Sequence, residues 1–383
     1  MPGRRWALIL ATAAWSAACS APPISSLATP APPPSGLSDR VTSLNVCITD
    51  QPETWTTGFQ SHSFVLPDGM RFGLGAPTLA GRLAFGQFGS SAGSGIGSVD
   101  LSTGRMTPIV TYEPGASGMG WMAVELPWVV WEQGNSQTNP ADWSLLAWNR
   151  ESGERLTLAT SRLADGSFLS GQSPLPAIRR GTVTWAQPLP KRADYNEAQI
   201  HVFDLSRKRD TAIASGRVGV PVFAGGYLVW GRRDAEGRYS FQAVDADTLQ
   251  HADLPPRLRD PGPIVYTAGS PRYLAWSGEG SRSLVVWPID SQGYREYRAP
   301  DLGHTFQFIQ LAGDYVLFYG GASSTVLDLG SGRGFDVSGS LAGSEQTIAK
   351  EEASAPAQKG TAVSSRLSSV PLTAVGPVGP CPR

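Results

Sequence analysis

Eleven polar, charged and aromatic side chains are concentrated in three loops between residues 132 and 239. Carboxylates and amides can hydrogen bond a polar ligand, arginines can pair with anionic groups, and aromatic rings can stack on apolar or sugar surfaces. Loops on a rigid scaffold are where binding residues are usually found. We therefore predict a binding face formed by Glu132, Asn135, Asp142, Trp143, Lys191, Arg192, Asp194, Tyr195, Arg232, Arg233 and Tyr239.

Five acidic residues of these loops offer a catalytic alternative. Glycoside hydrolysis requires two carboxyl groups roughly 5–10 Å apart on either side of the scissile bond. The spacing of the acidic residues along the chain selects no such pair. An extracellular carbohydrate-active or other propeller enzyme, with carboxylates at the mouth of a central channel, stays the alternative to a binding protein, and no catalytic residue is assigned. The acidic residues are Glu132, Asp142, Asp194, Asp234 and Glu236.

Other kinds of chemistry have no support in the sequence. The chain has no C-x-x-C pair, and a G-x-S-x-G match at residues 89–93 falls in a glycine-rich loop without the strand–turn–helix context that it needs. We predict neither a metal site nor a cofactor. The net charge of −1, with 16% charged residues, is also unlike a nucleic-acid-binding protein. No metal-ligand spacing such as H-E-x-x-H connects the four histidines, His62, His201, His251 and His304.

The scaffold that must position the loops is visible as a repeat. Six copies of a strand–turn–strand unit each end on a large aromatic residue, and successive aromatics lie 42 to 54 residues apart. This period, with strand patterning, is typical of a propeller in which each repeat forms one small sheet. We expect these aromatics to pack between neighbouring blades. They are Phe85, Trp131, Trp185, Trp230, Trp276 and Phe318.

A second recurring feature is an acidic or amide residue after the third strand of each repeat. Asp and Asn side chains hydrogen bond their own backbone in tight turns, so we interpret these residues as turn formers rather than as catalytic or metal-binding groups. A fourth, less regular strand follows each turn, which completes a four-stranded antiparallel blade. The turn residues are Asp100, Asn149, Asp204, Asp245, Asp290 and Asp328.

Six blades account for about residues 75–339, and strand-like segments remain at both ends of the chain. The N-terminal segments are 41–49, 54–59 and 62–66, and the C-terminal ones are 360–365 and 369–375. We predict that both ends together build a seventh blade, which gives an all-β propeller of seven four-stranded blades. A six-bladed ring with ordered extensions is the alternative.

This layout resembles the TolB-like and related WD-repeat or quinoprotein-like propellers of exported bacterial proteins over about residues 75–340. The resemblance rests on the blade pattern and on turns such as VDLSTGR and LDLGSGR. The S-P-D-G turn of TolB-type repeats and the Trp-docking signature of quinoprotein repeats are missing. The resemblance therefore implies an architecture and transfers no active site.

Two of the three cysteines, Cys47 and Cys381, lie near the two ends of the folded part. An exported protein meets oxidising conditions, and a closed ring brings its ends together, so we predict a disulfide between them. Two unrelated buried thiols are the alternative. Closing so long a loop is worth on the order of 4–5 kcal/mol in the chain-entropy model.

The N-terminal residues have the features of an export signal. Arg4 and Arg5 precede an apolar stretch over residues 6–18 that is too short to span a bilayer. The sequence SAAC, ending at Cys19, resembles the lipobox of bacterial lipoproteins, which implies cleavage before Cys19 and lipidation of its thiol. The predicted organisation is a signal peptide (1–18), a lipidated cysteine with a Pro/Ser/Ala-rich tether (19–39) and one propeller domain (40–383).

These features together predict a lipid-anchored, extracytoplasmic protein of the cell envelope, with a secreted protein as the alternative. Its expected role is that of a non-catalytic binding or assembly platform. The expected partners are a protein or a glycan on the loop face and the membrane through the N-terminal lipid. In architecture, such a role is similar to that of the lipoprotein propeller of outer-membrane β-barrel insertion.

Overall fold

A computed structural model describes residues 40–381, apart from residues 68, 91–92, 114–117, 170, 172, 191–196, 279–281, 290, 292, 300–305, 320–322 and 354–363. The predicted export signal, Cys19 and the tether lie outside the described residues, as do Lys191, Arg192, Asp194 and Tyr195. Within the described ranges, none of the helices has the length and apolar character that crossing a bilayer requires.

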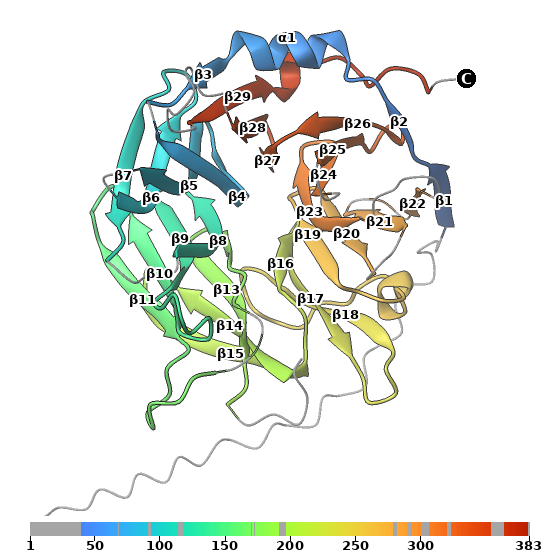
Figure 1. Cartoon of the computed structure of the whole chain (residues 1–383). Helices are drawn as coiled ribbons and strands as arrows, with labels where there is room; N and C mark the ends of the chain where they lie inside the picture. The colour runs from blue at the N-terminus through green and yellow to red at the C-terminus, as the bar shows by residue number, and fades with distance from the viewer. Residues whose placement is uncertain are drawn as a thin grey trace, which may run out of the picture. The chain divides into compact units, whose positions relative to one another are not determined.

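Seven small sheets form a ring (Figure 1). In such a propeller, the first strands of the blades surround a central channel. Blade 1 contains β4 (Arg71–Ala80), β5 (Leu83–Ser90), β6 (Gly93–Asp100) and β7 (Met106–Thr111). Blade 2 contains β8 (Gly118–Glu125), β9 (Trp128–Gly134), β10 (Trp143–Asn149) and β11 (Arg155–Thr160). Blade 3 contains β12 (Ala177–Arg179), β13 (Thr182–Pro188), β14 (Glu197–Asp204) and β15 (Arg209–Arg217). Blade 4 has three strands, β16 (Val222–Ala224), β17 (Tyr227–Arg233) and β18 (Tyr239–Asp245).

The remaining blades complete the ring after a short 3-10 helix, η1 (Pro256–Arg259). Blade 5 contains β19 (Tyr266–Gly269), β20 (Tyr273–Ser277), β21 (Ser283–Pro288) and β22 (Gly293–Arg298). Blade 6 contains β23 (Gln307–Ala312), β24 (Tyr315–Tyr319), β25 (Ser323–Asp328) and β26 (Arg333–Ser338). Blade 7 contains β27 (Ser340–Gly343), β28 (Thr347–Ala353) and β29 (Ser365–Pro371), which η2 (Leu372–Ala374) follows.

The seventh blade is assembled from both ends of the chain, as predicted. Its outermost strand is β3 (Ser63–Val65), which pairs antiparallel with β29. The seven-bladed prediction is therefore confirmed, and the six-bladed alternative is wrong.

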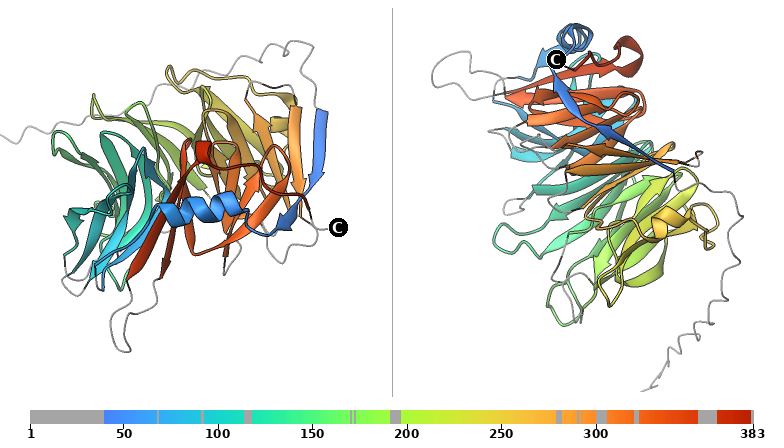
Figure 2. Two further views of the ribbon diagram at one scale, coloured as in Figure 1. Left: turned by 90° about the horizontal axis from the view of Figure 1, so that it is seen from above. Right: turned by 90° about the vertical axis from the view of Figure 1, so that its right-hand side faces the viewer.

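Two details of the N-terminal prediction are wrong. Residues 54–59 belong to a helix, α1 (Glu53–Ser61), because Trp55 and Phe59 are one helical turn apart and both are buried on one face. Residues 41–49 form β1 (Arg40–Asn45) and β2 (Cys47–Thr49), which do not join blade 7. They pair in parallel with β22 and β26 as fifth strands of blades 5 and 6. Figure 2 shows α1 along the outer rim of the ring, beside β29.

The recurring aromatics fill the contacts between blades, as expected. All six are at most 3% exposed, and each of the seven hydrophobic clusters combines side chains of two neighbouring blades. Trp230, for example, packs with Ile200 and Val202 of the preceding blade. In β28 the equivalent place is taken by Lys350, whose ammonium lies 5.5 Å from the ring centre of Phe59 in α1. Phe59 of the helix thus supplies the aromatic ring that the second strand of blade 7 lacks.

The acidic turn residues form the hairpins that were predicted for them. The Asp100 carboxylate accepts a hydrogen bond from the Ser102 N–H at 2.9 Å, and the Asp328 carboxylate accepts one from the Gly330 N–H at 2.7 Å. Asn149, Asp204 and Asp245 make the equivalent bonds. The interpretation of these residues as turn formers is confirmed at five positions; Asp290 lies outside the described residues.

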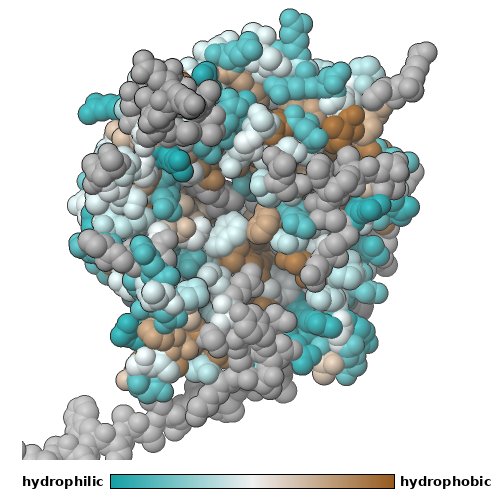
Figure 3. All heavy atoms as spheres, in the orientation of Figure 1, coloured by the Kyte–Doolittle hydropathy of each residue, from teal (hydrophilic) through white to brown (hydrophobic). Residues whose placement is uncertain are grey.

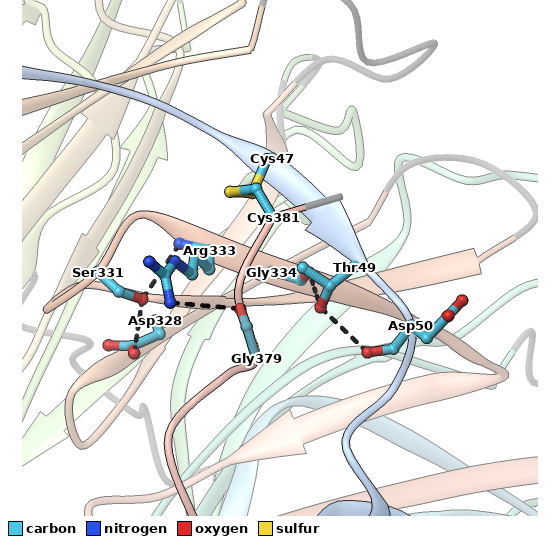
Figure 4. The surroundings of a disulfide bond; sticks show 9 residues. All are labelled: Cys47, Thr49, Asp50, Asp328, Ser331, Arg333, Gly334, Gly379 and Cys381. Carbon is cyan, nitrogen blue, oxygen red and sulfur yellow. Dashed lines mark hydrogen bonds between the residues drawn. A yellow bond between two sulfur atoms is a disulfide. The ribbon is translucent and has the colours of Figure 1, made fainter. Parts of the chain in front are cut away.

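The predicted disulfide joins Cys47 to Cys381, with 6.0 Å between their Cα atoms (Figure 4). It ties β2, at the outer edge of blade 6, to the C-terminal segment that returns along the same blade. On that blade the Arg333 guanidinium donates to the Gly379 carbonyl at 3.5 Å, and the Thr49 hydroxyl donates to the Gly334 carbonyl at 3.3 Å. The two ends of the described chain are thus fixed to one sheet.

Candidate binding site at the channel mouth

Three aromatic side chains from different blades meet at one mouth of the central channel. Trp121 of β8 and Phe308 of β23 are stacked with ring centres 6.0 Å apart, and Tyr266 of β19 lies 5.3 Å from Phe308. Trp121 and Phe308 lie near the beginning of β8 and β23, which pair with the ends of β9 and β24, so this mouth is on the face of the loops between second and third strands. Figure 3 shows apolar atoms around the hollow at the centre of the ring. Blades 2, 5 and 6 therefore contribute to one aromatic cluster.

A bulge in β8 directs Trp121 to this position. The pairing of β8 with β9 shifts between Met119 and Met122, and such a shift leaves backbone N–H groups outside the ladder. The Gln87 side chain of blade 1 accepts a hydrogen bond from the Met119 N–H at 3.1 Å, and the Glu132 carboxylate accepts one from the Trp121 N–H. Two side chains of neighbouring second strands thus stabilise the irregular backbone.

The buried environment of Glu132 disfavours the charged form of its carboxyl group. Its side chain is buried, and its Oε2 atom has no hydrogen-bond partner among the described residues. Burial raises the pKa of the carboxyl, while the Ser173 hydroxyl and the Trp121 N–H act in the opposite direction. A Cβ atom at position 120 would overlap the carboxylate, so Gly120 is required for this arrangement.

We expect Glu132→Gln to change how stability depends on pH. A glutamate whose pKa is higher in the folded than in the unfolded protein weakens folding as the pH rises. The loss begins near the unfolded pKa of about 4.3 and ends at the raised pKa. Each pH unit in this window costs about 1.4 kcal/mol. Glu132→Gln should be free of this loss and should retain an acceptor for the Trp121 N–H.

Denaturant unfolding between pH 4 and pH 8 measures the effect. Glu236→Gln serves as the control, because it makes the same chemical change on an exposed side chain of the same face. Parallel stability curves for wild type and Glu132→Gln across this range would contradict the assignment.

The aromatic cluster borders a cavity of about 260 Å³. Its walls include Leu74, Trp121, Phe308, Tyr319 and Leu341. The described lining contains no charged side chain. Phe308 is 47% exposed and Tyr319 is 43% exposed, so both offer apolar surface to a ligand.

Most of the predicted residues in the loop between β9 and β10 are buried, and the exposed Asn135 is bonded to one of them. The Asn135 amide donates to the Asp142 carboxylate at 3.0 Å, and Arg162 pairs with Asp142 at 3.1 Å. These contacts close the base of the loop between β9 and β10. Trp143 is 2% exposed, so its side chain contributes to packing between blades 2 and 3 rather than to a surface.

Exposed cations lie beside the loop between β17 and β18. Arg232 and Arg233 are exposed, and the Arg233 guanidinium lies 5.5 Å from the Tyr239 ring centre. Arg238 pairs with Asp234 at 2.8 Å and with Glu236 at 3.4 Å, so both carboxylates of this hairpin have a cationic partner. The participation of Arg232, Arg233, Tyr239 and the other predicted loop residues in binding stays a prediction.

Sequence reasoning missed the three aromatics of the channel mouth, although the repeat contains a signal for them. Trp121, Tyr266 and Phe308 each stand four residues before the residue that opens the first turn of their blade, Glu125, Ser270 or Ala312. One position of the repeat is therefore aromatic in three blades. Alignment of the repeats on their first turn, rather than on the buried aromatic, would have shown it.

The face with the turns between third and fourth strands has a different character. A cavity of about 550 Å³ between blades 2 and 3 is lined by Trp128, Glu154, Arg180 and Lys208 among others. Its charges are paired, with Lys208 and Glu154 2.5 Å apart and Arg180 3.0 Å from Asp247. In the described part of the chain, no group of three or more His, Cys, Asp or Glu side chains is arranged to hold a metal ion.

The closed ring of seven blades defines this chain as a β-propeller. No protein-family model matches the sequence, and no curated protein matches it. Among solved structures, the chain is similar to the β-propeller domain of the Trilobed protease from Pyrococcus furiosus. The TM-score is 0.50 and the identity 7%, over 75% of this chain and 90% of that chain.

Two further solved structures are similar in the same way. KlAtg21, in complex with the coiled coil of AgAtg16, has a TM-score of 0.50 and 11% identity over 76% of this chain and 95% of its own. TolB from Acinetobacter baumannii has a TM-score of 0.39 and 10% identity over 62% of this chain and 58% of its own. The seven blades and the two structures with a TM-score of 0.50 confirm the expected resemblance as one of propeller architecture, and identities this low show the fold alone.

Proposed function

We propose that this chain is a membrane-tethered, extracytoplasmic β-propeller that acts as a non-catalytic binding or assembly platform for a protein or a glycan. The observation that carries the proposal is the uncharged, partly exposed aromatic cluster at the channel mouth. Exposed aromatics on a rigid scaffold are typical of recognition sites. KlAtg21, a propeller in complex with a coiled coil, supports protein recognition by such a ring.

The tether is proposed from the sequence. Arg4, Arg5, the apolar stretch and Cys19 together resemble a lipoprotein signal, and the Pro/Ser/Ala-rich residues 19–39 would hold the propeller away from the bilayer. A single lipid chain binds a membrane reversibly, so anchoring would require the full lipoprotein modification.

We expect Cys19→Ser to release the protein from the membrane fraction. Fractionation of cells that express wild type or Cys19→Ser measures this directly, because the substitution removes the only thiol available for lipidation at the predicted cleavage site. Cys47→Ser provides the control for the loss of a cysteine elsewhere. Retention of Cys19→Ser in membranes, with its N-terminal segment still attached, would contradict the proposed anchor.

A carbohydrate-active or other propeller enzyme is the second candidate, and Glu132 is the observation that favours it. Burial raises the pKa of this carboxyl, as it does for general acids. A second carboxylate must face the first across the substrate. Asp142, Asp234 and Glu236 each pair with an arginine, and Asp194 lies outside the described residues.

The deciding experiment is a crosslinked pull-down of the tethered protein from its own membranes. Wild type is compared with the double variant Trp121→Ala/Phe308→Gly and with Arg180→Ala, a control on the opposite face. A second double variant, Arg232→Ala/Arg233→Ala, tests the predicted loop face. A partner that is retained by Arg180→Ala and lost by Trp121→Ala/Phe308→Gly supports the platform. No partner, together with a hydrolase activity that Glu132→Gln abolishes, would favour the enzyme.

A further inference from the structure

We propose that the channel mouth binds an apolar or aromatic anchor side chain in an uncharged segment of a protein partner. This inference rests on the proposed platform function and assigns the chemistry of its ligand. Trp121, Tyr266, Phe308 and Tyr319 form the binding surface.

Phe308 is held in a conformation that its side chain disfavours. Its φ angle is +47°, a region that bulky residues seldom adopt, and the pairing of β23 with β24 shifts at this point. The resulting ring is 47% exposed and contacts Trp121 and Tyr266. Burial of the Phe308 ring does not explain the positive φ, because nearly half of the side chain is exposed and the ring lines the cavity. Strained backbone of this kind is concentrated at functional sites.

The backbone of Trp121, which stacks on Phe308, is also held in place. Trp121 is fixed by the hydrogen bonds of Gln87 and Glu132 to the bulge of β8, described above. A binding surface that is ordered before the ligand arrives loses less conformational entropy on binding. The mouth thus has the rigid aromatic walls that a single inserted side chain requires.

The chemistry of the cavity favours an apolar anchor over a sugar. Besides the Tyr319 hydroxyl and the Trp121 indole N–H, three polar side chains are among its described lining, and two of these already make hydrogen bonds within the ring. The Ser324 hydroxyl donates to the Gly339 carbonyl at 2.9 Å, and the Gln310 Oε1 atom accepts from the Gly343 N–H at 3.3 Å. A sugar needs several free hydrogen-bonding groups, whereas an apolar side chain needs none.

The size and charge of the cavity lead to the same class of ligand. Its volume of about 260 Å³ is smaller than the roughly 300–1,000 Å³ of typical small-molecule sites, and it matches one or two inserted side chains. Because no charged group is among its described lining residues, a charged residue next to the anchor would lose hydration without gaining a partner there. The segment around the anchor should therefore be uncharged.

The test uses a display library of random twelve-residue peptides selected on the whole wild-type protein, with cellotetraose as the sugar probe. We expect the selected peptides to share one aromatic or aliphatic residue flanked by uncharged residues. Their affinity should fall by about tenfold or more in Phe308→Gly and in Trp121→Ala, and it should be unchanged in Arg180→Ala. Phe308→Gly is the informative variant, because glycine adopts the positive φ without strain, so the variant removes the ring while keeping the fold.

Three results would overturn the inference. They are peptides that bind Phe308→Gly as well as wild type, selected peptides that depend on charged residues, and cellotetraose binding in the absence of any selected peptide. The pull-down from membranes decides the platform function separately. A sugar bound at the mouth would be compatible with the proposed platform function, but it would contradict the proposed protein anchor.

Discussion

Removing the disulfide is expected to lower the free energy of unfolding by about 4–5 kcal/mol. Cys47 and Cys381 are separated by 334 positions in the sequence, and a crosslink between such distant residues removes many conformations from the unfolded chain. In the folded protein the same bond fixes β2 and the C-terminal segment to blade 6. Both Cys47→Ser and Cys381→Ser should therefore unfold at lower denaturant concentration than oxidised wild type.

The measurement is denaturant unfolding in a Cys19→Ser background, which prevents exchange with the third thiol. Wild type in reductant should match the double variant Cys47→Ser/Cys381→Ser, because both lack the same bond. Identical unfolding curves for the oxidised and reduced protein would show that the disulfide contributes nothing to stability.

Trp230→Ala is expected to cost about 3–5 kcal/mol, the range found for truncating a buried Trp or Phe. Trp230 is 3% exposed and fills the contact between blades 3 and 4. Its Nε1 atom has no hydrogen-bond partner among the described residues, so the side chain contributes through packing. Trp230→Phe should lose much less, because it retains most of the apolar volume.

Phe308→Gly is the matched control for this prediction. It also removes an aromatic ring, but it relieves the positive φ and gives up contacts worth about 0.5–1.5 kcal/mol each. Its stability should stay within about 1 kcal/mol of wild type. Denaturant unfolding of the three variants provides the comparison. Equal stabilities of Trp230→Ala and wild type would refute the packing role.

The propeller could be predicted from sequence because each blade carries its own local signals. A buried aromatic such as Trp185 and a turn residue such as Asp204 recur in every explicit copy, and both act within one blade or against the next. The N-terminal segment lacks such signals. The parallel pairing of β1 with β22 depends on a sheet edge that is 250 residues away in sequence, and α1 is a single helix of nine residues.

The channel mouth was missed for a different reason. An aromatic residue recurs before the first turn of three blades, but its meaning depends on the closure of the ring, which brings the three side chains together, and on the bulges in β8 and β23, which set their directions. The predicted loop residues were selected for polarity, which favoured Asp142 and Glu132. Both prove to be buried, where they support the loop and the β8 bulge.

The shared construction of blade 7 has a consequence for biosynthesis. During translation, residues 40–65 are made before blades 1 to 4, whereas β22, β26 and β29, with which they pair, belong to blades 5 to 7 and are made after them. Blades 1 to 4 can pack as they emerge, whereas the N-terminal segment must wait for nearly the whole chain. Until then its strands lack their partners. Ring closure must therefore await the synthesis of β29, and the disulfide between Cys47 and Cys381 can form only after residue 381 has been made.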